Sequence, residues 1–146
     1  MARPDAWRSD AAAYPHGALI QTRFQDLDTL GHINNVAMAG LFETARVRFN
    51  HSLGLMRFRG HRWLVAQVRV DYLAEAHFPD DVEVRTGIGH IGTRSWQILA
   101  AAFQKGEPVA TCDAVLVMER QMDFDSLPDQ FRAALERSMV KRPDQG

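Results

Sequence analysis

The sequence predicts an α+β fold in which an antiparallel sheet curls around one central helix. Three observations lead to this prediction: one long apolar segment with helical spacing, a succession of strand-like segments after it, and a turn signal between the last two strands. Because the strands follow one another without helices between them, the order does not fit βαβ units with a parallel sheet.

The first elements are expected on either side of residue 30. Over residues 18–25, Ile20, Thr22 and Phe24 alternate with polar residues, which is typical of a strand with one solvated face. From Val36 to about Ser52 the spacing becomes helical and indicates a buried helix. Its apolar positions are Met38, Leu41, Phe42, Ala45 and Phe49. Asn34 or Asn35 is a suitable N-cap, and Gly54 is a suitable stop.

The remaining elements complete the sheet. Alternating residues predict strands over about 64–72 and 82–88. A further pair of strands, about 94–104 and 108–119, is separated by the turn sequence Lys105-Gly106-Glu107-Pro108, as in a hairpin. Pro128 then opens a short helix to about Arg137.

Size and composition limit the classes of function. A chain of 146 residues with 46% hydrophobic content is typical of one domain, here residues 1–146, with residues 1–16 as a loose arm and 138–146 as a polar tail. The formal net charge of −1 gives no broad attraction to nucleic acid or an anionic membrane. Cys112 is alone, which excludes an internal disulfide and a cysteine metal cluster. With neither an apolar leader nor a membrane-spanning window, we expect a cytosolic protein.

The segment from Arg23 to Asn35 is the candidate reactive loop, because it places two acids, a histidine and two amides before the apolar helix. A helix start offers unpaired backbone N–H groups and a partial positive charge. It can therefore hold a developing oxyanion while a nearby carboxylate acts on the same centre. Acyl-transfer chemistry requires this combination.

Several motifs carry a family resemblance. Phe24-x-Asp26-x-Asp28-x-x-Gly31-His32-Ile33-Asn34-Asn35, followed by Leu41-Phe42-Glu43-x-Ala45-Arg46, resembles the hotdog-fold acyl-CoA thioesterases of the 4-hydroxybenzoyl-CoA thioesterase type. Val68-x-Val70-Asp71-Tyr72 and Ile88-Gly89-x-Ile91-Gly92-Thr93-Arg94-Ser95-Trp96 extend the likeness to about residues 18–122. The resemblance implies a five-stranded antiparallel sheet wrapped around a long helix. It also implies a homodimer or homotetramer with active sites at subunit interfaces.

Site residues follow from the resemblance by position. Asp28 takes the place of the catalytic aspartate, and the backbone N–H of Asn35 that of the group polarising the thioester carbonyl. Arg94 resembles a position near the CoA phosphates, and Ser95 beside it is a second candidate contact. The alternatives are a solvated surface side chain for Arg94 and strand packing for Ser95. No metal and no cofactor are implied.

The other polar residues of the motif can be structural as well as functional. His32 is either a general acid or a hydrogen-bonding residue that shapes the loop, and we favour the second. Asp26 is expected to be structural. Glu43 is expected to pair with polar neighbours on the helix and is kept as a secondary site candidate.

Two motif matches are rejected. Asp26-Leu27-Asp28-Thr29 matches the signature of aspartyl-phosphate phosphatases, but that chemistry needs a continuous apolar parallel strand before it. The segment over residues 87–92 matches the dinucleotide fingerprint GxGxxG, but it leads into a hairpin rather than a helix. Glycines that let a strand bend explain it better.

The sequence therefore predicts hydrolysis of an acyl-CoA or acyl carrier protein thioester to a carboxylic acid and a free thiol. One alternative is an enoyl-thioester hydratase, in which His32 and Asp28 form an acid/base pair. Another is a non-catalytic protein that binds acyl thioesters.

Overall fold

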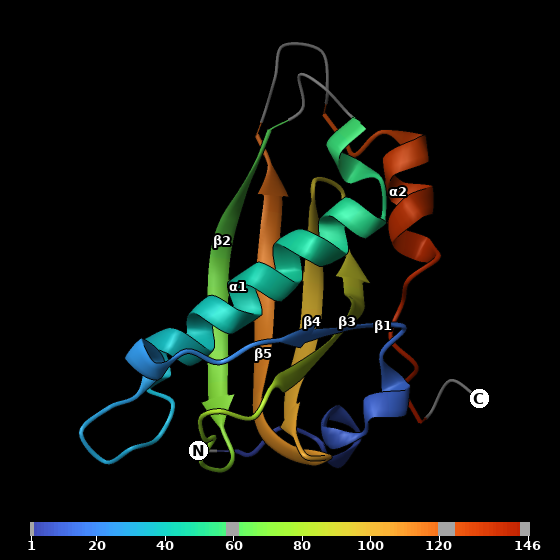
Figure 1. Ribbon diagram of the computed structural model, residues 1–146. Coiled ribbons are helices and arrows are strands. Elements are labelled where there is room, and N and C mark those ends of the chain that lie inside the picture. Colours follow the sequence, from blue (N-terminus) through green and yellow to red (C-terminus); the bar gives the residue numbers. More distant parts are fainter. Residues whose placement is uncertain (1, 58–61, 120–124, 144–146) are drawn as a thin grey trace.

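The computed structural model describes residues 2–57, 62–119 and 125–143. Its five strands form one antiparallel sheet in the order β1-β3-β4-β5-β2. The strands are β1 (His16–Ile20), β2 (Trp63–Tyr72), β3 (Val82–Ile91), β4 (Ser95–Gln104) and β5 (Glu107–Met118). The long helix α1 (Asn35–Ser52) crosses one face of the sheet (Figure 1). The short helix α2 (Asp129–Glu136) lies near the C-terminal end of α1. The predicted hotdog fold is confirmed.

Helix α1 begins and ends where the sequence predicted. The side chain of Asn34 caps it by accepting a 2.7 Å hydrogen bond from the N–H of Ala37, and Gly54 follows its end with a φ of 74°. One face of the helix is buried against the sheet, through the predicted residues Met38, Leu41, Phe42, Ala45 and Phe49.

The opposite face of α1 is open in this chain, which differs from the expectation of a buried helix. Val36 is 80% exposed and Val47 is 57% exposed. Gly40 and Glu43 are exposed as well, so Glu43 does not lie in the core. The apolar character of this face is therefore not explained by packing within the chain.

The first strand is shorter than predicted. It ends at Ile20, and Phe24–Asp26 form a 3-10 turn in which Phe24 is 74% exposed and Asp26 is buried. The cause is the carboxylate of Asp26, which accepts hydrogen bonds from the backbone N–H and the guanidinium of Arg23 and closes the turn. These bonds override the alternation that favoured a strand.

Where the structure describes them, residues 2–16 and 138–143 pack against the sheet, whereas the sequence suggested a loose arm and a polar tail. Two 3-10 turns, Ala6–Ser9 and Ala11–Ala13, place Tyr14 in full burial on the face of the sheet opposite α1. The guanidinium of Arg8 lies 2.7 Å from the carboxylate of Asp113 on β5. Val140 of the tail is buried in the same cluster, so both ends of the chain cover the sheet.

The glycine-rich end of β3 is part of the sheet, as predicted. The register between β3 and β4 shifts between Ile88 and His90, which is a bulge at Gly89. A Cβ atom at Gly87 would lie 2.7 Å from Pro15 and from Val140, so this glycine permits the close approach of the arm and the tail. In the described part of the chain, no helix is long and apolar enough to cross a membrane.

Candidate active site

The loop that carries Asp28 is closed by its own hydrogen bonds. Leu27 and Ile33 form an antiparallel bridge, and the N–H of Asp28 donates to the carbonyl of His32 at 2.9 Å. The Oδ1 atom of Asp28 accepts hydrogen bonds from the N–H groups of Leu30 at 2.9 Å and His32 at 3.1 Å. A short acidic side chain favours such a turn because it reaches backbone donors two to four residues ahead.

These bonds fix the charge of Asp28. Hydrogen bonds from the backbone of His32, and next from that of Leu30, hold the pKa of the exposed Asp28 carboxyl below its usual range, although partial desolvation opposes them. The carboxylate is therefore ionised at neutral pH. Its Oδ2 atom accepts no hydrogen bond from the described residues, which leaves one oxygen available to a ligand.

A second set of bonds fixes the start of α1 beside this loop. The backbone and side-chain N–H groups of Asn34 both donate to the carbonyl of Asp26, at 2.8 Å and 2.9 Å. Burial raises the pKa of Asp26, but the hydrogen bonds and the charge of Arg23 outweigh it, so the pKa lies below its usual range. Asp26 is thus the structural residue that the sequence predicted.

The first backbone N–H groups of α1 are free. The side chain of Asn34 accepts a hydrogen bond from the N–H of Ala37. No group among the described residues accepts a hydrogen bond from the N–H of Asn35 or Val36. Free donors of this kind are expected in the first turn of a helix, where no preceding turn supplies carbonyls. They carry the partial positive charge of the helix start.

Asp28, His32 and Asn35 line one pocket of about 280 Å³, so the structure brings the three predicted catalytic residues together. Met38 of α1 and Tyr72 of β2 complete its walls, with the segment after β2. The hydroxyl of Tyr72 donates a 3.0 Å hydrogen bond to the carbonyl of Asn35. The strand therefore holds the first residue of the helix.

His32 is engaged away from Asp28. Its Nε2 atom lies 3.1 Å from the carboxylate of Glu75, and its ring meets that of His77 edge to face at 5.3 Å between centroids. The side-chain pair of His32 and Asp28 that a hydratase would use is not formed. Glu75 could not be predicted from the sequence, because no local pattern marks a residue whose partner lies in another loop.

Arg94 and Ser95 lie at the other end of the sheet. The guanidinium of Arg94 donates to the carbonyl of Met118 at 2.7 Å, and Ser95 pairs with Val117 of β5, whereas Tyr72 of the pocket pairs with Ala110. The rise of a strand places these two positions of β5 about 23 Å apart. Within one chain, the candidate CoA contacts and the Asp28 pocket are separate.

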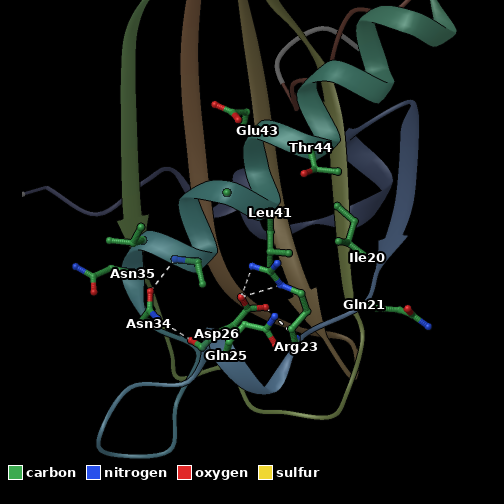
Figure 2. A pocket seen from close by; sticks show the side chains of 13 residues that line it. Ile20, Gln21, Arg23, Gln25, Asp26, Asn34, Asn35, Leu41, Glu43 and Thr44 are labelled. Atoms are coloured by element: carbon green, nitrogen blue, oxygen red, sulfur yellow. Dashed lines mark hydrogen bonds and ion pairs between the residues drawn. The ribbon is translucent and has the colours of Figure 1, made fainter.

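A larger groove of about 780 Å³ lies along the start of α1 and also includes Asn35 (Figure 2). Its walls come from β1, from the segment after β1 and from the first turns of α1. Among the described residues, no group of three or more His, Cys, Asp or Glu side chains is placed to hold a metal ion.

Comparison with known proteins agrees with the fold. The family model for the thioesterase-like superfamily matches residues 22–135, and no curated protein matches the chain. The structure is similar to the PA5185 protein of Pseudomonas aeruginosa strain PAO1, with a TM-score of 0.77 and 29% identity, covering 88% of this chain and 94% of that chain.

Two further solved structures are similar over most of their length. A thioesterase from Thermus thermophilus, complexed with coenzyme A and Zn, has a TM-score of 0.75 and 30% identity, covering 86% of this chain and 95% of that chain. A predicted thioesterase from Bacillus stearothermophilus has a TM-score of 0.75 and 28% identity, covering 86% of this chain and 97% of that chain.

Proposed function

The chain belongs to the thioesterase-like superfamily, and from that premise we propose that it is a cytosolic thioesterase of the 4-hydroxybenzoyl-CoA thioesterase type. It hydrolyses an acyl-CoA or acyl carrier protein thioester to a carboxylic acid and a free thiol. The observation that carries the proposal is that one pocket is lined by Asp28, an ionised carboxylate, and by Asn35, whose backbone N–H has no acceptor among the described residues.

The two groups have complementary roles. The thioester carbonyl oxygen accepts a hydrogen bond from the N–H of Asn35, which stabilises the negative charge that develops on it; one such donor is worth about 3 kcal/mol in other enzymes. The free Oδ2 atom of Asp28 either takes a proton from the attacking water or attacks the carbonyl carbon itself. In the first route the water oxygen bonds to the carbonyl carbon, the carbon–sulfur bond breaks, and the proton held by Asp28 passes to the leaving thiolate. In the second route the carbon–sulfur bond breaks as a mixed anhydride forms on Asp28, the thiolate takes a proton from water, and a further water hydrolyses the anhydride to release the acid and restore Asp28.

We assign His32 a positioning role. Its backbone N–H donates to Asp28 and its ring pairs with Glu75, so it ties the reactive loop to the segment after β2. This arrangement favours the loop-shaping reading over that of a general acid.

The proposal includes a homodimer. β2 is an edge strand whose residues Leu64, Val65 and Val68 are 47–54% exposed, and an uncovered apolar edge of this kind pairs readily with another strand. Antiparallel pairing of two β2 strands around a two-fold axis would set the start of one β2 beside the end of the other. Arg94 and Ser95 of the partner subunit would then approach the Asp28 pocket, so the separation seen within one chain fits a shared site.

A panel of acyl-CoA esters and acyl carrier protein thioesters, assayed with a thiol-detecting dye, tests the function. Release of free thiol with acid formation is the expected result. Addition of water to an enoyl thioester without thiol release would mark the hydratase instead. Saturable binding with no turnover across the panel would mark a binding protein.

A further inference from the structure

A polar pocket of about 340 Å³ on the face of the sheet opposite α1 has no role in the mechanism above. Three adjacent strands supply its floor. Arg69 of β2 and Leu99 of β4 are both paired with Asp113 of β5 in the register, so the three side chains project to one face. The N-terminal arm, from Ala2 to Arg8, and Arg142 of the C-terminal tail form its walls.

The walls of this pocket are particular to this chain. The match to the thioesterase-like superfamily begins at residue 22 and ends at residue 135, so the arm and the tail both lie outside it. The pocket also shares no lining residue with the Asp28 pocket. It is therefore a separate site, and its properties do not follow from membership of the family.

Four arginines and three aspartates line the pocket. Two of the arginines are paired within the chain. The guanidinium of Arg8 lies 2.7 Å from the carboxylate of Asp113, and that of Arg69 lies 3.1 Å from the carboxylate of Asp71. Arg8 is only 7% exposed and also donates to the hydroxyl of Tyr14 at 2.9 Å, so its charge is committed to the fold.

The two other arginines, Arg3 and Arg142, outnumber the one remaining carboxylate, that of Asp5. None of these three side chains forms an ion pair with another described residue. The pocket therefore carries one positive charge in excess, although the formal net charge of the chain is −1. The side-chain amide of Gln97 lines it as well and has no hydrogen-bond partner among the described residues.

The guanidinium of Arg142 is held in place by two contacts. One nitrogen donates to the carbonyl of Gly89 at 2.9 Å, and Gly89 is the bulged residue that has no partner in the register of β3 and β4. The guanidinium carbon lies 5.6 Å from the centroid of the Trp7 ring. The other two nitrogens of Arg142 have no acceptor in the described part of the chain, so a fixed pair of donors is left for a ligand.

We propose that this pocket binds a small organic anion through a phosphate or carboxylate group, held by Arg3, Arg142 and the amide of Gln97. Guanidinium groups bind both kinds of oxyanion through forked hydrogen bonds. The volume lies within the range of about 300–1,000 Å³ that small-molecule sites occupy. A bound anion would join the N-terminal arm to the C-terminal tail and stabilise the packing of both on the sheet.

NMR titrations of the purified full chain test the site directly. Sodium phosphate and sodium acetate are added separately at constant ionic strength, with sodium chloride as the reference. The indole N–H resonance of Trp7, which lines the pocket, is followed and is assigned by its absence in Trp7→Phe. We expect a saturable shift and a rise in Tm with phosphate, acetate or both. Tighter binding of phosphate would indicate a phosphorylated ligand, and tighter binding of acetate a carboxylic acid.

Variants with opposite expected effects separate binding from damage to the fold. Arg3→Gln and Arg142→Gln should each weaken anion binding about tenfold, because each loses charge-assisted hydrogen bonds. Glutamine at position 142 keeps a donor for the carbonyl of Gly89, and Arg3 has no partner to lose, so both variants should stay folded. Asp5→Asn should strengthen binding about two- to threefold, since it removes the one unpaired carboxylate.

Two controls remove a positive charge elsewhere. Arg48→Gln changes an exposed residue of α1, on the other side of the sheet, and Arg94→Ala removes the proposed CoA contact. Both should leave the anion affinity unchanged. Loss of phosphate binding in Arg94→Ala would place the anion at the CoA contact and overturn the inference. Shifts equal to those with chloride, or equal affinities in the wild type, Arg3→Gln and Arg142→Gln, would overturn it as well. These measurements involve no thioester, so their failure would leave the proposed hydrolysis intact.

Discussion

The hydroxyl of Tyr72 donates a 3.0 Å hydrogen bond to the backbone carbonyl of Asn35, which ties the last residue of β2 to the first residue of α1. The carbonyl is on the same residue as the N–H assigned to the oxyanion. The bond therefore connects the edge of the sheet to the orientation of the proposed donor.

Tyr72→Phe should lower kcat while changing KM little. The ring keeps its packing, but the first turn of α1 loses a hydrogen bond worth about 1 kcal/mol, so we expect a five- to tenfold loss in kcat, on the order of that energy. Steady-state kinetics and urea unfolding of the same samples check this. Unchanged kcat together with lowered stability would assign Tyr72 a purely structural role.

Asp28→Asn should keep the fold and abolish turnover. The asparagine Oδ1 atom can still accept from the N–H groups of Leu30 and His32, so the loop remains closed, but the charged oxygen is lost. We expect kcat to fall by about a thousandfold or more, with an unchanged circular dichroism spectrum and a slightly lower Tm, because hydrogen bonds to the charged oxygen become hydrogen bonds to a neutral one. Asp28→Ala is the companion variant, which loses the loop bonds as well. Full hydrolysis by Asp28→Asn would remove Asp28 from the mechanism.

Asp26→Asn should lower stability at neutral pH and change its dependence on acid. The folded-state pKa of Asp26 lies below its unfolded value, so its ionisation stabilises the fold above pH about 3.9, and this contribution disappears as the pH falls through the lower folded value. We expect a loss of about 1–3 kcal/mol at pH 7 and a smaller difference from the wild type at pH 3. Urea unfolding at both pH values measures it. An equal difference at both would contradict the assignment.

Arg94→Ala should raise KM for acyl-CoA about tenfold, which corresponds to the loss of about 1.4 kcal/mol of binding energy. The effect should be absent for an acyl thioester of N-acetylcysteamine, which lacks the phosphates. In a tandem-fused dimer, Arg94→Ala and Asp28→Asn placed in different halves should leave one complete site with the wild-type KM if the contact is made across the interface. Placed in the same half, they should leave one site with its Asp28 but without Arg94, and so with the raised KM. Unaltered KM for acyl-CoA would dismiss Arg94 as a ligand contact.

The elements that the sequence predicted well are those fixed by local patterns. Helix α1 follows from its apolar spacing, the Asn34 cap and the Gly54 stop, and the hairpin between β4 and β5 follows from Lys105 and Gly106, both of which have positive φ. The arm was missed because Arg8 is held by Asp113, a partner far away in the sequence. Phe24 was misplaced for a similar reason, since the bonds of Asp26 decide the path of that turn.

The candidate site also combines residues that local sequence predicts with residues that depend on long-range pairing. The sequence could group Asp28, His32 and Asn35 because their loop and the helix start are adjacent in the chain, and all three line one pocket. Glu75 and the hydroxyl of Tyr72 reach that pocket from beyond the helix, through pairing that no short window of residues encodes.

The packing of both chain ends on the sheet has a consequence for assembly. The N–H of Lys141 donates to the carbonyl of Ala13, and the cluster around Tyr14 and Val140 occupies the face of β4 that carries Leu99, Ala101 and Phe103. Two sheets could stack through the faces opposite α1 only if the N-terminal arm and the C-terminal tail first left those faces. A tetramer of this protein should therefore grow from the helix-bearing side of the proposed dimer.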